Sequence, residues 1–212
     1  MKADRFFLAC LRDTVGSNVS FHCKNGRGYS TALHLAHEYT REQAQSAWDR
    51  GRDFDLPLNA DMVEELSVFH VDCQYLPTET VIEDECREYV AFEKGKWNGN
   101  DVYWITNKGL PTCDFNKAAV FDAPGDDDQL VWVPLHMACK VRRRTFCIDL
   151  INRRRMIQAS GLITPDHVKR SRRRKNSSGK TRWNCPACGK ISWQYNPYDF
   201  EGCNDIYCKE AA

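Results

Sequence analysis

Four cysteines near the C-terminus constrain the fold of this chain more than any other feature. They form two pairs, Cys185 with Cys188 and Cys203 with Cys208, and fourteen residues separate the pairs. The first pair lies in the sequence Cys-Pro-Ala-Cys-Gly, in which the proline stiffens the turn and Gly189 lets backbone N–H groups face the sulfur atoms. Two such pairs predict a closed tetrahedral site for one Zn²⁺ ion. A closed site leaves no position for a substrate, so we expect this zinc to be structural.

Two other interpretations of these cysteines are open from the sequence: a disulfide pair, or scattered buried thiols. The paired spacing favours the metal site. Cys208 departs from the pattern, because four residues separate it from Cys203 whereas two separate the members of the first pair. The remaining seven of the eleven cysteines are isolated in the sequence. Isolated cysteines are typical of a reducing compartment, so we expect a cytoplasmic protein.

The net charge of +1 conceals an uneven distribution of charged residues. Residues 1–139 hold 13 Lys and Arg against 23 Asp and Glu, and residues 140–182 hold 15 against 2. The chain therefore has an acidic body, a basic connector and a cysteine-rich tail. So dense a basic segment beside a zinc ribbon predicts a nucleic-acid partner, DNA or RNA, bound through its phosphates without sequence specificity. The alternative is a solvated linker, or one that docks on the acidic body.

Fourteen basic residues are the candidates for contact with nucleic acid. They are Arg142, Arg143, Arg144, Arg153, Arg154, Arg155, Lys169, Arg170, Arg172, Arg173, Arg174, Lys175, Lys180 and Arg182. The aromatic residues Trp193 and Tyr195 add the possibility of stacking on an unpaired base, which predicts a preference for single strands.

The body contains a weak internal repeat. A shift of 83 residues aligns 5–10 with 88–93 and 19–26 with 102–109, and a slightly different shift aligns 68–73 with 134–139. This alignment makes Phe21 equivalent to Trp104, and His70 equivalent to His136. The expected fold is α+β: duplicated small antiparallel β-rich units with one or two helices, then a basic helical connector and a zinc ribbon. The expected boundaries are 1–82, 83–141, 142–180 and 181–212.

Local patterns predict the elements within each copy. The sequence from Thr40 to Gln43 is a capping box, which predicts a helix that ends at Gly51 in the first copy only. Apolar alternation predicts that residues 131–141 form one closing strand in the second copy. Residues three apart on a strand point to opposite faces, so we expect Cys73 and Cys139 to be buried and their histidine neighbours exposed. No second zinc site is expected from these His-x-x-Cys pairs.

In the connector, the apolar residues have a helical spacing rather than the alternating spacing of a strand. Phe146, Leu150 and Ile157 are spaced for a helix, and the sequence Thr-Pro-Asp from Thr164 predicts the start of a second helix. A sequence-reading helix-turn-helix is one interpretation of this pair. An arginine-rich arm that grips phosphates without sequence preference is the favoured one.

The common enzyme motifs are missing from the sequence. It has no Gly-rich phosphate loop, no nucleophile elbow and no HExxH helix. We therefore expect a non-enzymatic protein. The weaker alternative is a metal-dependent hydrolase that uses His34, His37 or Asp126–Asp128. No apolar run approaches the ~20 residues that span a bilayer, so no membrane partner is expected.

Two segments resemble known proteins. The tail, TRWNCPACGKISW followed by CNDIYC, resembles the zinc ribbons that end Spartan-like (SprT-type) metallopeptidases and related phage proteins. This resemblance implies zinc ligation by the four cysteines but no protease activity, because the peptidase helix has no counterpart. The segment GRGYSTALHLAHEYTREQAQSAWDRG resembles uncharacterised proteins of phages, prophages and plasmids of enteric bacteria. It implies a mobile-element accessory protein that acts on host nucleic-acid or defence machinery.

Two functions from different classes follow. In the first, the connector and ribbon bind nucleic acid, while the body binds a host protein complex or self-associates. In the second, the chain is a protein-only inhibitor of a host defence nuclease complex, of the anti-CRISPR or anti-restriction type. The acidic body would then face a basic surface of its target.

Overall fold

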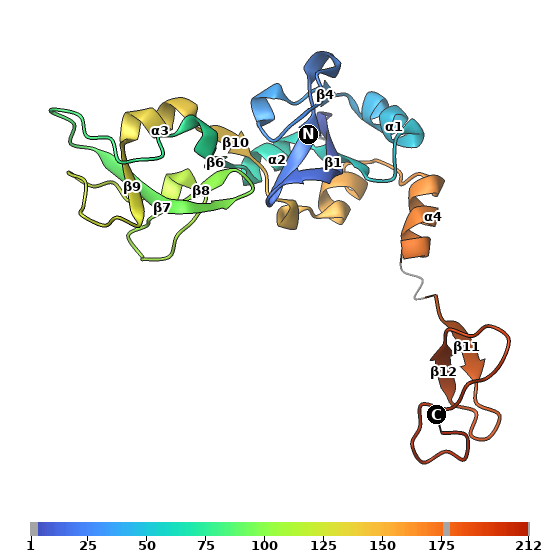
Figure 1. The fold of residues 1–212 in the computed structure, drawn as a ribbon. Helices are drawn as coiled ribbons and strands as arrows, with labels where there is room; N and C mark the ends of the chain where they lie inside the picture. The colour runs from blue at the N-terminus through green and yellow to red at the C-terminus, as the bar shows by residue number, and fades with distance from the viewer. Residues whose placement is uncertain (1–3, 176–178, 212) are drawn as a thin grey trace. The chain divides into compact units, whose positions relative to one another are not determined.

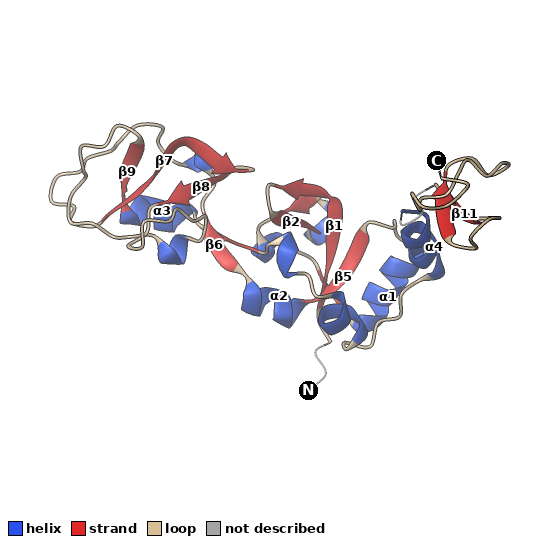
Figure 2. Cartoon of the chain, turned by 90° about the horizontal axis from the view of Figure 1, so that it is seen from below, coloured by secondary structure: helices blue, strands red, loops and turns tan. Residues whose placement is uncertain are grey.

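The computed structural model describes residues 4–175 and 179–211 (Figure 1). The chain divides into two compact units, Met1–Thr164 and Pro165–Ala212. The strand pairs within each unit are antiparallel, and short helices accompany the sheets (Figure 2). The fold is therefore α+β. Unit 1 contains both predicted repeats, and unit 2 contains the cysteine-rich tail.

The first repeat is built around the long strand β1. This strand pairs with β2, β4 and β5, and β3 extends the sheet beyond β2. Two helices, α1 and α2, flank β5 in the sequence. The bounds are β1 (Phe6–Val15), β2 (Asn18–His22), β3 (Tyr29–Ser30), β4 (Glu38–Tyr39), α1 (Arg41–Arg50), β5 (Asp55–Asn59) and α2 (Ala60–Leu66).

Helix α1 forms where the capping box predicts it. The Gln43 N–H donates to Thr40 Oγ1, and the Gln43 side chain accepts from the Thr40 N–H. Two residues of the apolar face of this helix are buried: Ala44 is 1% exposed and Trp48 is 0% exposed. The helix ends at Gly51, as the sequence predicts.

The second repeat reproduces the first without α1. Trp104 pairs with Phe92 as Phe21 pairs with Ala9, which is a shift of 83 residues for both partners. Both aromatic side chains are fully buried. The predicted equivalence of Phe21 and Trp104 is therefore confirmed. The bounds are β7 (Tyr89–Asn98), β8 (Asp101–Trp104), β9 (Leu130–Pro134) and α3 (Leu135–Val141).

The single strand expected over residues 131–141 is wrong. Strand β9 ends at Pro134 and helix α3 follows, so that α3 is the counterpart of α2. Apolar residues at Leu135, Ala138 and Cys139 fit a helical spacing as well as an alternating one, and a short segment does not discriminate between the two.

The expectations for the two histidines are also corrected. His136 lies on α3 and is exposed, whereas His70 lies on β6 (Val68–His70) and is buried. The two residues are therefore not equivalent. Cys73 and Cys139 are both half-buried rather than buried. Strand alternation does not apply to either cysteine, because Cys73 begins a 3₁₀ turn and Cys139 lies on helix α3.

The two repeats exchange their last strands. Strand β6, from the first repeat, pairs with β10 (Arg143–Thr145), and Figure 1 shows this pair between the two sheets. Val71, which follows β6, packs in the core of the second repeat with Val102 and Trp104. Phe146, which follows β10, packs against Phe21 of the first repeat, with ring centroids 6.5 Å apart. Each repeat thus completes the core of the other.

This exchange corrects the expected connector. Residues 146–157 do not form one helix: they contain a 3₁₀ turn, Ile148–Leu150, and a π-helical segment, Arg154–Gln158. Met156 and Ile157 are 0% and 2% exposed, and their segment contacts β5. The first part of the basic segment therefore belongs to the folded body.

Unit 2 begins with a basic helix and continues into a hairpin. Its elements are α4 (Asp166–Lys175), β11 (Thr181–Asn184) and β12 (Ile191–Gln194). Within the described parts of the chain, no helix has the length and apolar character to cross a membrane.

Candidate metal centre and hairpin face

The four predicted ligands come together in unit 2. The Sγ atoms of Cys185 and Cys208 are 3.6 Å apart, as are those of Cys188 and Cys203. All four sulfur atoms lie within 4.8 Å of one another. Sulfur atoms bound at ~2.3 Å around one tetrahedral metal ion lie about 3.8 Å apart, so the set fits such an ion. A disulfide needs a separation of ~2.05 Å, which these pairs do not have.

Two tight turns position the sulfur atoms. In the first, the Gly189 N–H donates to the Cys185 carbonyl at 2.8 Å, and Gly189 adopts a φ of +73° that favours glycine. In the second, the Cys208 N–H donates to the Asp205 carbonyl at 2.9 Å. The Glu210 N–H donates to Cys208 Sγ at 3.5 Å. Cys208 thus belongs to the set despite its wider spacing.

The turn around the first pair also favours the metal-binding form of Cys185. Desolvation acts to raise the pKa of its thiol, but the N–H groups of Cys188 and Ala187 outweigh it and lower this pKa to about 7. A thiolate rather than a thiol is the metal ligand. At Cys208 the Glu210 N–H acts to lower the pKa, but desolvation and the neighbouring cysteines outweigh it and raise this pKa to about 12, so binding of a metal ion by all four sulfur atoms releases protons.

The hairpin beside the cysteines has one buried and one exposed face. On β12, Ser192 and Gln194 are buried, and the Ser192 hydroxyl donates to the Gly202 carbonyl at 3.2 Å. The alternating residues Ile191, Trp193 and Tyr195 are 50%, 51% and 70% exposed. Side chains alternate along a strand, so Ile191 and Trp193 share the opposite face, and the exposed Tyr195 follows directly after the end of β12.

Basic side chains lie across from these exposed residues. Arg182 pairs directly with Trp193 in the β11–β12 register and is itself exposed. Lys180 Nζ lies 5.1 Å from the centre of the Tyr195 ring. We call this surface the hairpin face; it consists of Lys180, Arg182, Ile191, Trp193 and Tyr195.

Arg142 and the two arginines of β10, Arg143 and Arg144, are used largely within unit 1. Arg143 is only 13% exposed, and its guanidinium bonds Asp101 Oδ1 at 2.6 Å. The guanidinium of Arg142 stacks at 4.6 Å over the Phe69 ring. Arg144 donates to the carbonyl of Glu64. These contacts give the segment a structural role in the body.

The same arginines border a pocket that the sequence did not reveal. It has a volume of about 350 Å³, and Lys24 and His34 also line it. Its acidic members are Glu38 and Glu64, which are both ion-paired to Arg5. Lys24 and His34 are far from the arginines in the sequence, so no local pattern could have linked them.

The other candidate basic residues divide into two groups. Arg153, Arg154 and Arg155 are exposed on unit 1, and Lys169 and Arg170 are exposed on α4. The side chains of Arg172, Arg173, Arg174 and Lys175 lie outside the described side chains.

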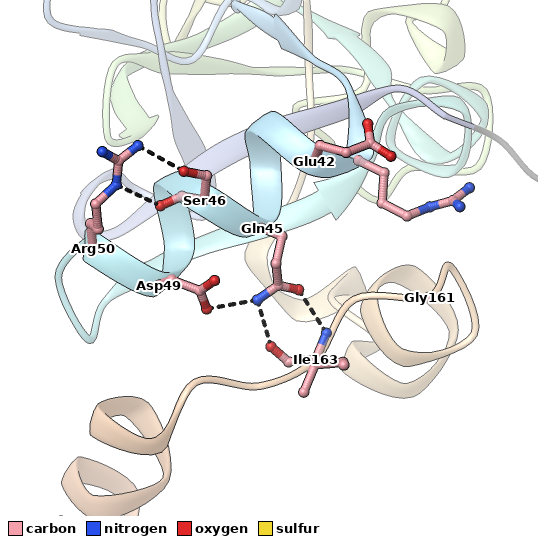
Figure 3. Close-up of a pocket in the computed structure, with 8 residues that line it drawn as sticks. Glu42, Gln45, Ser46, Asp49, Arg50, Gly161 and Ile163 are labelled. Carbon is pink, nitrogen blue, oxygen red and sulfur yellow. Dashed lines mark hydrogen bonds between the residues drawn. The ribbon is translucent and has the colours of Figure 1, made fainter.

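A surface pocket of about 660 Å³ runs along α1 (Figure 3). Gln45 points from this helix to the last residues of unit 1, where its Oε1 accepts from the Ile163 N–H at 2.8 Å. Its Nε2 donates to the Ile163 carbonyl at 2.9 Å. The Gln45 amide therefore holds the end of unit 1 by two backbone bonds, which is a structural function.

The residues of the hydrolase alternative are not gathered into a site. His34 and Asp126–Asp128 are exposed, and the His37 ring packs against Tyr39. Among the residues that the structure describes, three or more potential metal ligands come together at only two places. One is the four-cysteine set, and the other is formed by Glu83, Cys86 and His136.

Comparison with known proteins found no matching family model, no similar curated protein and no similar solved structure.

Proposed function

We propose that this chain is a non-enzymatic protein that binds single-stranded nucleic acid through the hairpin face. The observation that carries this proposal is the pairing of exposed aromatic and basic side chains across β11 and β12. Trp193 lies opposite Arg182, and Tyr195 lies beneath Lys180. Such surfaces bind single strands because every base has a flat face that stacks on an aromatic ring.

The geometry suits two bases. One residue separates Trp193 from Tyr195, which follows directly after β12, and this spacing corresponds to roughly 7 Å in an extended chain. Each ring can therefore stack on its own base, and each stack contributes about 1–3 kcal/mol of binding free energy. The neighbouring Arg182 and Lys180 neutralise phosphates and release counterions, which adds a salt-dependent contribution.

The charge distribution between the units supports the same assignment. Unit 2 contains 10 Lys and Arg against 5 Asp and Glu, whereas unit 1 contains 20 against 24. The net charges are therefore +5 and −4 with neutral cysteines, and four thiolates around one Zn²⁺ ion leave unit 2 at +3. A polyanion is attracted to unit 2 and repelled by unit 1. The exposed Lys169 and Arg170 of α4 add to the positive charge of unit 2.

We further propose that the four cysteines bind one structural Zn²⁺ ion, which holds the hairpin in shape. Within residues 179–211, the buried side chains that the structure describes are two cysteines and two polar residues: Cys185, Cys203, Ser192 and Gln194. So small a core does not stabilise a fold by itself, and metal binding supplies the missing free energy. Four thiolates at tetrahedral separations are the donor set that zinc prefers in structural sites.

Fluorescence anisotropy of a labelled oligodeoxythymidine tests the proposal. Trp193→Ala should weaken binding by roughly 5- to 100-fold, which corresponds to the loss of one stack. Trp97→Ala is the matched control, because Trp97 is 52% exposed on β7 in unit 1 and Trp193 is 51% exposed. Zinc content should be the same in the wild-type chain and both variants.

Two results would contradict the proposal. One is equal affinity of the Trp193→Ala and Trp97→Ala chains, and the other is no binding of single-stranded DNA or RNA by the full chain. The second result would favour the protein-only inhibitor instead.

A further inference from the structure

A second group of potential metal ligands lies on unit 1, at the corner where β7 begins and α3 begins. Glu83, Cys86 and His136 place one ligand atom each within 4.8 Å of the others. His136 Nε2 lies 3.7 Å from Glu83 Oε2. A carboxylate, a thiol and an imidazole from two distant parts of the sequence therefore converge on one point.

The loop that carries Glu83 and Cys86 is held firmly. The hydroxyl of Tyr89, a residue that is only 1% exposed, accepts from the Glu83 N–H and donates to the Glu83 carbonyl, each at 3.1 Å. The Cys86 N–H closes the turn onto the same carbonyl at 3.3 Å. Between them, Glu85 adopts a φ of +66°, in the left-handed region that favours glycine, and the Cys86 thiol donates to the Glu88 carbonyl at 3.5 Å. This turn directs Cys86 back toward Glu83.

The first repeat offers an internal comparison for this corner. Its helix α2 is tied to β1 by a bond from the Ala60 N–H to the Arg5 carbonyl, and α3 is tied to β7 by the bond from the Leu135 N–H to the Glu88 carbonyl. Asp61 is therefore the counterpart of His136, and Arg5 is the counterpart of Glu88.

The two corners differ in their cation. In the first repeat, the Arg5 guanidinium bonds the carboxylates of Glu38, Asp61 and Glu64, each at 3.0 Å. In the second repeat the arginine is replaced by Glu88. Among the described residues, Glu83 forms its ion pair with His136, a side chain that is charged only when protonated. In the ion pairs of the described residues, Glu83 is therefore matched by an imidazole, where Glu38, Asp61 and Glu64 are matched by an arginine.

We propose that Glu83, Cys86 and His136 bind a divalent transition metal ion of the zinc type, separate from the four-cysteine centre. Oxygen, sulfur and nitrogen ligands together suit Zn²⁺ or Co²⁺, whereas Mg²⁺ and Ca²⁺ prefer oxygen alone. Three protein ligands leave a coordination position open to water or a partner's side chain. The ion takes the place that the Arg5 guanidinium holds in the first repeat. The chain then carries two metal ions rather than the one expected from the sequence.

Cobalt titration of the full chain tests this site, after its four-cysteine centre has been loaded with zinc. A thiolate bound to Co²⁺ gives a charge-transfer absorption that is absent for oxygen and nitrogen ligands. The wild-type chain should bind one Co²⁺ with this absorption and retain its zinc. Cys86→Ser should abolish the absorption, and His136→Ala should weaken Co²⁺ binding by about 100-fold or more, since loss of an outer-shell partner alone costs 10- to 100-fold.

Cys139→Ser is the matched control, because Cys139 is a half-buried cysteine on the same helix as His136 and should leave the absorption unchanged. Glu83→Gln, at a side chain that is 41% exposed, tests the site without disturbing the core and should weaken Co²⁺ binding at least about tenfold. The proposal is overturned if the wild-type chain shows no thiolate absorption. It is also overturned if the absorption survives in Cys86→Ser, or if Glu83→Gln binds Co²⁺ as tightly as wild type.

Discussion

Asn18 and Asp101 occupy the same position in the two repeats, 83 residues apart, and their side chains meet: Asn18 Nδ2 donates to Asp101 Oδ2 at 2.5 Å. Both residues are fully buried. The strands that the repeats exchange complete the contact, because His70 Nδ1 bonds Asp101 Oδ2 at 2.6 Å and the Thr145 hydroxyl donates to Asn18 Oδ1 at 2.9 Å. A buried polar network therefore joins the repeats at the point where their sequences correspond.

The hairpin turns of the two repeats also meet, through Gly16 and Gly99. A Cβ atom on Gly16 would lie 2.6 Å from the backbone carbonyl carbon of Asn98, and the φ of Gly16 is +57°. Gly16→Ala should lower the free energy of unfolding by roughly 1–3 kcal/mol, since both the strained φ and the clash disfavour alanine. Denaturant unfolding measures this effect. Gly109→Ala is the control, because Gly109 has a φ of +75° but no atom within 4 Å of its Cβ position. Equal destabilisation by the two substitutions would contradict the close approach of the turns.

Asp101 should make unit 1 sensitive to acid. Desolvation acts to raise the pKa of this carboxyl, but the hydrogen bond with His70 and the charge of Arg143 outweigh it, so the pKa lies below the ordinary value of 3.8. A lowered pKa stabilises the folded state above the unfolded pKa, and this stabilisation disappears as the pH falls from about 4 toward the folded pKa.

Asp101→Asn leaves Arg143 buried without a counter-charge and should destabilise unit 1 by roughly 3–5 kcal/mol near neutral pH. The difference from wild type should shrink as the pH falls below the ordinary value of 3.8 toward the folded pKa, because the wild-type carboxylate then loses its charge. Denaturant midpoints measured across this range check the prediction. A difference that stays constant with pH would show that Asp101 does not titrate in this window.

Metal removal should affect the units separately. The zinc ion of the four-cysteine centre should remain on the chain after gel filtration, and Cys185→Ser should release it. The hairpin should then become accessible to protease while the unfolding transition of unit 1 stays unchanged, because all four cysteines of the metal site lie in unit 2. Metal analysis and limited proteolysis measure both effects. Disappearance of the unit 1 transition in the Cys185→Ser chain would contradict the independence of the units.

The basic residues of the hairpin face should determine how binding depends on salt. The double variant with alanine at Lys180 and Arg182 should flatten the plot of log affinity against log salt concentration by about 0.7 for each phosphate that is no longer neutralised. The double variant with alanine at Lys94 and Lys96 is the control, since these exposed lysines lie on β7 in unit 1. An equal slope for the two double variants would place the phosphate-binding residues elsewhere.

Local patterns in the sequence predict the features that depend on neighbouring residues. The spacing of the cysteine pairs predicts which four sulfur atoms meet, and the capping box predicts α1. The 83-residue shift predicts the equivalence of Phe21 and Trp104, because both strands keep the same alternation. Each of these signals is contained in a short stretch of the chain or in a direct comparison of two such stretches.

Other features depend on contacts between distant segments, and the sequence did not predict them. The exchange of β6 and β10 is a pairing choice that no local pattern encodes. The apolar residues around Phe146 have helical spacing in the sequence. In the structure, however, Phe146 directly follows a three-residue strand and packs in the core of the first repeat. Cys86 has no neighbouring cysteine or histidine at a ligand spacing, so only the fold places it beside His136.

The central claim is that nucleic acid contacts the hairpin face, and photo-crosslinking tests it most directly. An oligonucleotide that carries 4-thiothymidine would be irradiated with the full chain, and the crosslinked peptides would be identified by mass spectrometry. We predict crosslinks at Trp193 or Tyr195, and their disappearance when both residues are replaced by alanine. The absence of any crosslink, or crosslinks only around Arg142 and Arg144 in unit 1, would contradict the claim.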